Sequence, residues 1–279
     1  MAYKTLLTIL TDPATVQHTL EAASALAARE DAHLDVLSLG IDRSQMGYSY
    51  IGGAAVLAQV SIERAESDAA ALDAAAKAVM DRQGIRWSAE AAVAQLGGLG
   101  GLVALRARFS DLVVLPRPYG KDRGAEGEAV VEAAMFEGQA PVLILPDDKD
   151  APEANGRVVV AWNQSREAMA AVRRALPLLK RAELVNIAVI DPPQHGPERS
   201  DPGGMLCQML VRHGVRAEVS VLAKTVPRIS DILARHVRDQ NAGLLVMGAY
   251  GHSRFREAIL GGATRNTLEQ SEVPVFMAH

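Results

Sequence analysis

Short, continuous apolar runs alternate along the chain with longer segments in which apolar residues recur every three or four positions. An apolar run without polar alternation is typical of a parallel strand buried on both faces, and the longer spacing predicts amphipathic helices. In the first half the pattern predicts strands at 4–10, 33–40, 85–93, 111–115 and 141–145, and helices at 15–29, 54–83, 99–109 and 128–137. Strands that alternate with helices predict an α/β fold with right-handed crossovers and a parallel sheet.

The pattern starts again after a charged, turn-rich segment at 147–156, DDKDAPEANG, which we interpret as a linker. The second half predicts strands at 157–162, 183–190, 215–222, 242–247 and 274–278, and helices at 165–180, 202–213, 226–238 and 264–270. DLVVLP in the first half parallels GLLVMG in the second, and QAPVLILP parallels EVPVFMAH. The repeat predicts two tandem domains, 1–146 and 157–279, each a doubly wound five-stranded parallel sheet with helices on both faces.

Composition narrows the class of protein further. Hydrophobic residues make up 49% of the chain but aromatic residues only 4%, which is typical of parallel strands covered by Ala-rich helices. The net charge of -4 and the lack of a basic tract argue against nucleic-acid binding. A single cysteine, Cys207, favours a reducing, cytoplasmic compartment, and no apolar stretch approaches the ~20 residues that span a bilayer. We therefore expect a cytoplasmic protein with neither a nucleic-acid nor a membrane partner.

The candidate site is the stretch LLVMGAYGHSRFREAILGGAT, which starts as a buried strand and breaks into a glycine loop at Gly248. Glycines let a backbone approach a ligand, and a helix N-terminus offers free N–H groups to phosphate. Ligands of such sheets bind beyond the carboxyl ends of the strands, which is where this loop and Asn163 lie. The alternative for the loop is a pair of turns with ordinary helix caps. For Asn163 the alternative is a turn or cap before the helix that begins at Ser165.

Gly248, Gly251 and Gly261 resemble, in their spacing, the G-x2-G-x9-G-(S/T) nucleotide loop of the universal stress protein family, and the resemblance extends over both repeats. It implies a Rossmann-like fold of the adenine-nucleotide alpha-hydrolase type that binds ATP or ADP, with or without Mg²⁺. Its members hold adenine near an acid after the first strand and phosphates on the glycine loop. The implied binding residues here are Gly248, Gly251, Gly261, Gly262, Thr264, Asn163, Ile190 and Arg254.

Two positions depart from the family pattern in the second half. Gly262 stands where Ser or Thr is expected, so that a backbone N–H remains but a hydroxyl is lost, and Thr264 is placed to replace part of that contact. Asn163 stands where the family has an acid, and its amide can still hydrogen-bond to adenine or ribose. Both departures are expected to change the affinity for the nucleotide more than the position of the site.

The first half departs further. Its loop PRPYGKDRGAEG lacks the glycine spacing, and Pro116, which has no N–H, stands where Gly248 stands in the second half. Asp12 takes the position of the adenine-side acid, although a helix cap also explains it. We expect this half to bind no triphosphate in the family mode. It would instead pair with the second half as an internal pseudo-dimer, and further homodimerisation stays open.

No catalytic or metal-binding motif is found. GxSxG, GxxxxGK(S/T) and HExxH are absent, and the seven histidines show no ligand spacing. We therefore expect a signalling or stress-response role with an unknown protein partner, and at most slow ATP hydrolysis. The alternatives are a protein-interaction module with a decayed site and, more remotely, a small-molecule enzyme that uses the glycine-rich 46–54 region.

Overall fold

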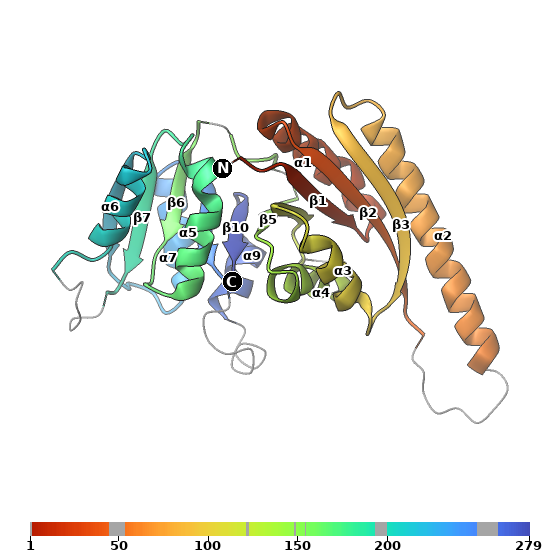
Figure 1. Cartoon of the computed structure of the whole chain (residues 1–279). Helices are drawn as coiled ribbons and strands as arrows, with labels where there is room; N and C mark the ends of the chain where they lie inside the picture. The colour runs from red at the N-terminus through yellow and green to blue at the C-terminus, as the bar shows by residue number, and fades with distance from the viewer. Residues whose placement is uncertain are drawn as a thin grey trace. The chain divides into compact units, whose positions relative to one another are not determined.

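A computed structural model of the chain describes residues 2–44, 54–120, 123–147, 149–153, 155–192, 200–249 and 262–279. The chain divides into two compact units, Tyr3–Ala140 and Pro141–His279 (Figure 1). Each unit has its own strands and helices, so each is described separately.

The first unit, Tyr3–Ala140, contains a parallel sheet with the strand order β3-β2-β1-β4. α1 and α2 pack against each other, α2 lies along β2 and β3, and α3 packs with α4 (Figure 1). The elements are β1 (Thr5–Leu10), α1 (Val16–Glu30), β2 (His33–Asp42), α2 (Ala54–Met80), β3 (Arg86–Gln95), α3 (Leu99–Ala107), β4 (Leu112–Pro116), α4 (Ala125–Glu132) and a π-helical turn (Ala133–Glu137).

Small residues set the close approach of helix and strand in this unit. A Cβ atom added to Gly40 of β2 would collide with the carbonyl oxygen of Ala65 in α2 and would lie 2.8 Å from its carbonyl carbon. The backbones of β2 and α2 therefore touch, which a glycine on the strand and an alanine on the helix allow. Ala65, Ala69 and Ala76 of α2 are buried, and the small side chain at Ala65 permits this close contact.

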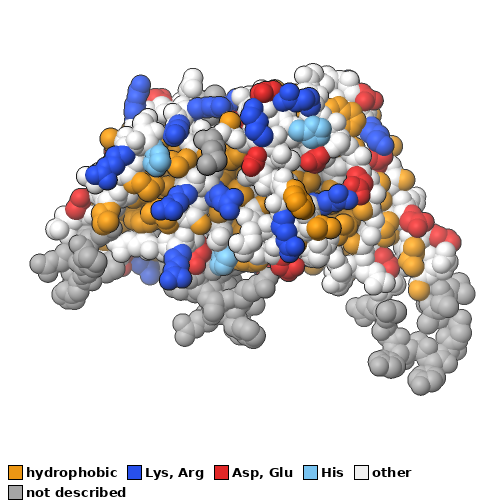
Figure 2. All heavy atoms as spheres, in the orientation of Figure 1, with side chains coloured by type: hydrophobic (Ala, Val, Ile, Leu, Met, Phe, Trp, Pro, Cys, Tyr) orange, Lys and Arg blue, Asp and Glu red, His pale blue; other side chains and the backbone are white. Residues whose placement is uncertain are grey.

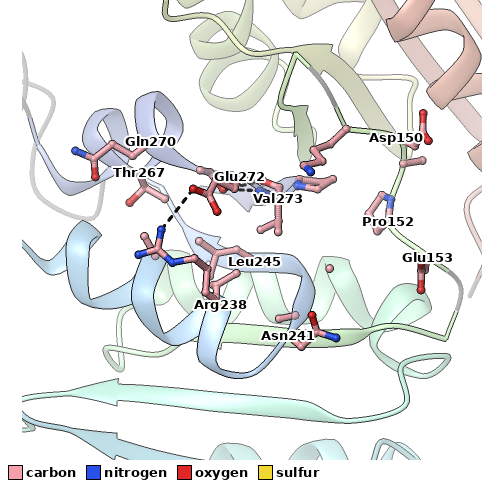
Figure 3. Close-up of a pocket in the computed structure, with 18 of the residues that line it drawn as sticks. Asp150, Pro152, Glu153, Arg238, Asn241, Leu245, Thr267, Gln270, Glu272 and Val273 are labelled. Atoms are coloured by element: carbon pink, nitrogen blue, oxygen red, sulfur yellow. Dashed lines mark hydrogen bonds and ion pairs between the residues drawn. The ribbon is translucent and has the colours of Figure 1, made fainter.

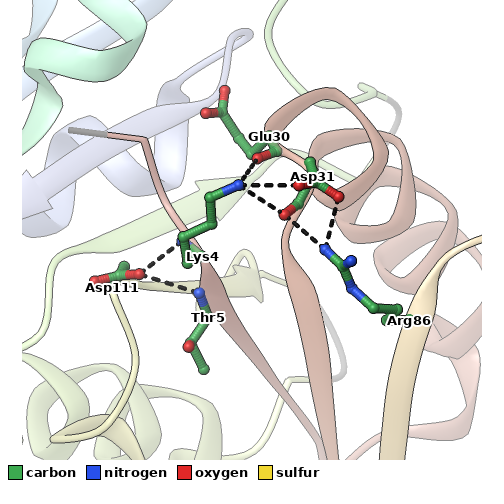
Figure 4. A network of polar contacts seen from close by, with 6 residues as sticks. All are labelled: Lys4, Thr5, Glu30, Asp31, Arg86 and Asp111. Carbon is green, nitrogen blue, oxygen red and sulfur yellow. Dashed lines mark hydrogen bonds and ion pairs between the residues drawn. The ribbon is translucent and has the colours of Figure 1, made fainter.

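A polar network holds together the amino-terminal edge of the first sheet (Figure 4). The Asp111 carboxylate accepts the backbone N–H groups of Lys4, at 2.7 Å, and Thr5, at 3.0 Å. Asp31, which ends α1 in the left-handed conformation with φ of 49°, forms ion pairs with Lys4 at 3.1 Å and Arg86 at 2.7 Å. The hydrogen bond from Lys4 and then the charge of Arg86 lower the pKa of Asp31 below its ordinary 3.8. The network links the starts of β1, β3 and β4 to the end of α1.

The second unit, Pro141–His279, contains a sheet with the strand order β5-β10-β9-β6-β7-β8. The described pairings are parallel except that of β5 with β10, which is antiparallel. The elements are β5 (Val142–Leu145), β6 (Arg157–Ala161), α5 (Arg166–Leu179), β7 (Val185–Ile190), α6 (Gly204–Arg212), β8 (Ala217–Leu222), α7 (Ile229–Asp239), β9 (Ala242–Gly248), α9 (Ala263–Gln270) and β10 (Val275–Ala278).

A buried hydrogen-bonded group lies between α7 and the outer strands of the second sheet. The His236 ring is 6% exposed, and its Nε2 lies 2.7 Å from Asn186 Oδ1. The Asn186 amide nitrogen donates to Glu218 Oε1 and to Ser220 Oγ, both at 2.8 Å. Burial lowers the pKa of His236, and the charges of Asp239 and Glu218 partly oppose this shift. The imidazole is therefore held neutral in the folded protein more strongly than in the unfolded chain.

The α/β architecture and the order of elements agree with the sequence prediction, with strand ends within two residues of the predicted ones. One strand differs in its surroundings. The strand at Val142–Leu145 falls in the second unit, where it pairs antiparallel with β10, so the boundary between units precedes this strand. Both strands are four-residue apolar segments that close a repeat, and their pairing covers an edge that would otherwise expose unpaired backbone groups. None of the helices in the described part of the chain is long and apolar enough to cross a membrane.

Candidate functional site

Three of the sequence-predicted residues lie together at the carboxyl edge of the second sheet. Ile190 is the last residue of β7, Gly248 is the last residue of β9, and Asn163 follows β6 by two residues. β6 lies between β9 and β7, and Ala161 of β6 is in register with both Met247 and Ala188. The strand order changes direction between β6 and β9, which is where doubly wound sheets form a ligand crevice.

Gly248 is required by the packing of this edge. A Cβ atom added to Gly248 would collide with the backbone nitrogen of Ala168 and would lie 2.6 Å from the Glu167 carbonyl carbon and 2.8 Å from the Ala168 Cα atom. The end of β9 therefore touches the first turn of α5, which only a residue without a side chain allows. The glycine has a structural role whether or not a ligand approaches it.

Asn163 and Ser165 shape the start of α5. Asn163 Oδ1 accepts the backbone N–H of Ser165 at 3.1 Å, and Ser165 Oγ accepts the N–H of Ala168 at 3.1 Å as the N-cap of the helix. The residue between them, Gln164, has φ of 63°. The side-chain oxygen of Asn163 therefore takes part in the turn before α5, as the alternative interpretation predicted. Its amide nitrogen has no partner among the described residues and remains able to donate.

The second predicted part of the site is the start of α9. Gly262 is the N-cap residue and provides no side-chain cap, so the first N–H groups of α9 lack that partner. Thr264 is 4% exposed and lies in the first turn. Because β10 follows α9 and runs parallel to β9, α9 starts toward the carboxyl edge of the sheet. Gly251, Gly261 and Arg254 lie outside the described residues, as does most of the glycine-rich 46–54 region.

Trp162, which sequence reasoning missed, belongs to the same edge. It directly follows β6, its backbone N–H donates to Ala188 at 2.9 Å, and its side chain is 7% exposed. The indole Nε1 is buried and has no partner within the described part of the chain. A tryptophan beside the predicted ligand residue Asn163 was the available signal, because buried indole N–H groups usually find a hydrogen-bond partner.

A cavity of about 460 Å³ lies at the opposite edge of the second unit (Figure 3). It is lined by the starts of β9 and β10, by α7 and α9, and by residues 149–153 before β6. An exposed ion pair joins Arg238 and Glu272 at 3.4 Å on its wall. None of the predicted site residues that the structure describes lines this cavity. Its polar groups come from helix ends and turns that carry no motif, so this cavity could not be predicted from the sequence.

A second cavity, of about 350 Å³, lies in the first unit beyond the carboxyl ends of β1, β2 and β4. Asp12 and Pro116 line it. The Asp12 carboxylate accepts the N–H of Ala14 at 2.9 Å, as the predicted helix cap, and forms an ion pair with Arg123 at 3.1 Å. The glycine spacing, Pro116 and Asp12 were the signals taken from this region of the sequence, and the arginines that follow the strand ends were missed.

The metal-binding side chains and the surface charges limit the chemistry that either unit can offer. Among the residues that the structure describes, no group of three or more His, Cys, Asp or Glu side chains is placed to hold a metal ion. Figure 2 shows Lys and Arg side chains lying singly on the visible face, separated by apolar, acidic and uncharged groups. The described geometry therefore offers backbone N–H groups and amides at the second unit's carboxyl edge, and guanidinium groups with carboxylates in the first.

Comparison with known proteins gives a family match for part of the chain and a fold for nearly all of it. The model of the universal stress protein family matches residues 154–279. A universal stress protein of Synechocystis sp., Slr1230, is 33% identical over 69 residues, which are 25% of this chain and 23% of that protein. The match thus spans about a quarter of the curated relative.

Solved structures resemble the chain over nearly its full length. A universal stress protein from Archaeoglobus fulgidus aligns with 99% of this chain and 96% of its own at a TM-score of 0.70 and 17% identity. A protein of unknown function from Pseudomonas aeruginosa PAO1 aligns with 99% of this chain and 92% of its own at a TM-score of 0.58 and 14% identity. At these identities the likeness shows a shared α/β fold. Residues 154–279 thus match the universal stress protein family, and over nearly its whole length the chain shares the α/β fold of the universal stress protein from Archaeoglobus fulgidus.

Proposed function

We propose that the second unit binds ATP or ADP in the crevice at the carboxyl ends of β6 and β9, and that the bound nucleotide governs interaction with a protein partner in a stress response. The observation that carries the proposal is that Asn163 follows β6 and Gly248 ends β9, two adjacent strands between which the strand order changes direction. Little or no catalysis is required of such a site.

The start of α9 supplies the phosphate-binding part of the proposal. Gly262 leaves the first-turn N–H groups without a side-chain cap, and these groups carry the positive end of the helix dipole. The loop residues Gly251, Gly261 and Arg254 would complete the cradle. Because Gly262 brings no hydroxyl, the phosphates would be held mainly by backbone N–H groups, with Mg²⁺ sharing their charge when it is present.

Asn163 supplies the nucleoside-binding part. Its oxygen is engaged by Ser165, so its amide nitrogen is the group that can donate to a ribose hydroxyl or to the base. Ile190, half-buried at the end of β7, offers apolar contact beside it. A neutral amide gives orientation and a modest contribution to affinity, of about 1 kcal/mol for a typical hydrogen bond.

Trp162 provides the test, because it directly precedes Asn163. The chain contains two tryptophans, and the other, Trp87, lies on β3 of the first unit. In the Trp87→Phe variant, titration with MgATP should change the Trp162 emission saturably. No saturable change up to millimolar nucleotide would contradict the proposal and favour the alternative, an interaction module without nucleotide.

A pair of substitutions locates the ligand. Asn163→Ala in the Trp87→Phe background should weaken MgATP about fivefold through loss of one hydrogen bond. Gln270→Ala, which alters the 460 Å³ cavity at the opposite edge, should leave the titration unchanged. If Gln270→Ala weakened MgATP binding and Asn163→Ala did not, the nucleotide would bind in that cavity instead.

A further inference from the structure

The cavity of the first unit occupies a second point where a strand order changes direction. In the order β3-β2-β1-β4, the crevice between β1 and β4 is the expected ligand position. The cavity of about 350 Å³ lies there, walled by the loop after β1, the end of β2, α2, the segment after β4 and the start of α4. This volume is at the small end of the range for small-molecule sites.

The inner wall of the cavity is aliphatic. The side chains that form it are all buried and come from three strands and two helices: Ile9, Leu39, Ile41, Leu72, Leu115 and Val130. Such a surface gives an apolar ligand group a favourable contact without requiring any particular polar partner.

Among the described residues, the mouth of the cavity carries charges of both signs. Three guanidinium groups and three carboxylates line it: Arg43, Arg117, Arg123, Asp12, Asp68 and Glu126. Two ion pairs join segments far apart in the sequence. Asp12 pairs with Arg123 at 3.1 Å, and Arg43 pairs with Glu126. The Arg123 and Glu126 side chains are only 17% and 16% exposed, so these pairs belong to the wall and not to the open surface.

The same arrangement disfavours a polyphosphate. Pro116 offers no N–H at the end of β4. The N-terminus of α4, which has Gly124 as its N-cap, is approached by the carboxylate of Glu126, so the protein's own anion occupies the position that a phosphate would take. A polyanion would have to displace both Glu126 and Asp12 from their guanidinium partners and leave two carboxylates beside it.

A ligand that carries one charge of each sign lowers this cost, because its positive charge compensates the carboxylate that its negative charge displaces. Asp68 of α2 lines the cavity at its exposed mouth and has no hydrogen-bond or ion-pair partner among the described residues. A ligand ammonium group can pair with Asp68 without breaking an existing contact. The ligand carboxylate can take the place of Asp12 on Arg123, which exchanges one ion pair and leaves that of Arg43 with Glu126 intact. Asp12 would then face the same ammonium group. Every charge at the mouth stays compensated.

We propose that the first unit binds an α-amino acid with an apolar side chain in this cavity, with the ammonium group on Asp68 and Asp12, the carboxylate on Arg123, and the side chain against the aliphatic wall. The site differs in position and chemistry from the proposed nucleotide site of the second unit and does not depend on it.

Ligand-observed saturation-transfer NMR on the full chain tests the proposal with L-leucine, L-methionine and L-phenylalanine. At least one should bind saturably at millimolar concentration. Two analogues of phenylalanine separate the contributions of its charges, since 3-phenylpropionate lacks the ammonium group and 2-phenylethylamine lacks the carboxylate. Each should bind about tenfold more weakly than the amino acid, the loss expected for one charged contact. Equal binding of the analogues, or no binding of the three amino acids, would overturn the proposal.

A matched pair of variants assigns the contact. Asp68→Asn should weaken the amino acid about tenfold, while Glu66→Gln, an equal charge change on the exposed surface of the same helix outside the cavity, should not. Thermal unfolding should show that both variants fold as the parent does. If both substitutions weakened amino-acid binding equally, the loss of affinity would come from the change in net charge, and the assigned role of Asp68 would be refuted.

Discussion

The contact between Gly248 and α5 gives the sharpest structural prediction, because it separates the packing role of this glycine from any role in binding. Replacement by alanine adds one Cβ atom against three backbone atoms of the first turn of α5, each within 3 Å of its ideal position. Backbone atoms cannot rotate away as a flexible side chain can. The strand end or the helix start must therefore move.

The size of the effect follows from that geometry. Overpacking a tight site by one carbon costs typically ~1–3 kcal/mol, and a collision with three backbone atoms places Gly248→Ala near the upper end. At about 2–4 °C per kcal/mol, the expected fall in the melting temperature is on the order of 6–12 °C.

Differential scanning calorimetry measures this shift against a matched control. Gly243→Ala lies on the same strand, and its added Cβ atom would meet no atom within 4 Å. The control should change the free energy of unfolding by less than about 0.5 kcal/mol. If Gly248→Ala melts with the control, the contact between β9 and α5 is not as close as described, and the packing explanation of this glycine is wrong.

Three further predictions concern polar groups. Asp31 has a lowered pKa, so its stabilising effect is present above pH 3.8 and is lost as the pH falls through the folded-state value. In acid denaturation followed by circular dichroism, Asp31→Asn should lose less stability below pH 4 than the wild type does. Parallel denaturation curves of the two proteins would refute this. His236 also has a lowered pKa, so the unfolded chain binds its proton first and the free energy of unfolding should fall as the pH drops below 6.5. Urea unfolding at pH 7.5 and 5.5 should show a smaller loss of stability for His236→Gln than for the wild type, and equal losses would contradict this. Asp111→Ala removes the acceptor of two backbone N–H groups at the start of β1 and should cost about 1 kcal/mol in urea unfolding, whereas an unchanged midpoint would show that water replaces the carboxylate fully.

Most of the fold could be predicted from the sequence, because the buried strands are continuous apolar runs and the helices have clear periodicity. The repeat made the prediction stronger, since DLVVLP and GLLVMG mark the same strand twice. The surroundings of Val142–Leu145 could not be predicted in this way. A four-residue apolar strand has no preference for a parallel or an antiparallel neighbour, so its pairing with β10 is set by tertiary packing.

The candidate site was predictable only in part. The end of a strand followed by glycine placed Gly248 and Asn163 at one edge, because parallel strands bring their carboxyl ends together. The collision that explains Gly248 comes from α5, 80 residues earlier in the chain (248 against 168), and local sequence carries no trace of it. The ion pairs of Arg43 and Arg123 could not be predicted either, because their partners Glu126 and Asp12 are distant in sequence.

Isothermal titration of the full chain with MgATP tests the central claim most directly, because it counts the sites. A nucleotide crevice in the second unit and a first unit closed to polyphosphate by Pro116, Glu126 and Asp12 together predict one ATP per chain, with a stoichiometry unchanged by Asp68→Asn. Two equivalents would contradict the exclusion of nucleotide from the first unit, and no heat up to millimolar ATP would contradict nucleotide binding by the second.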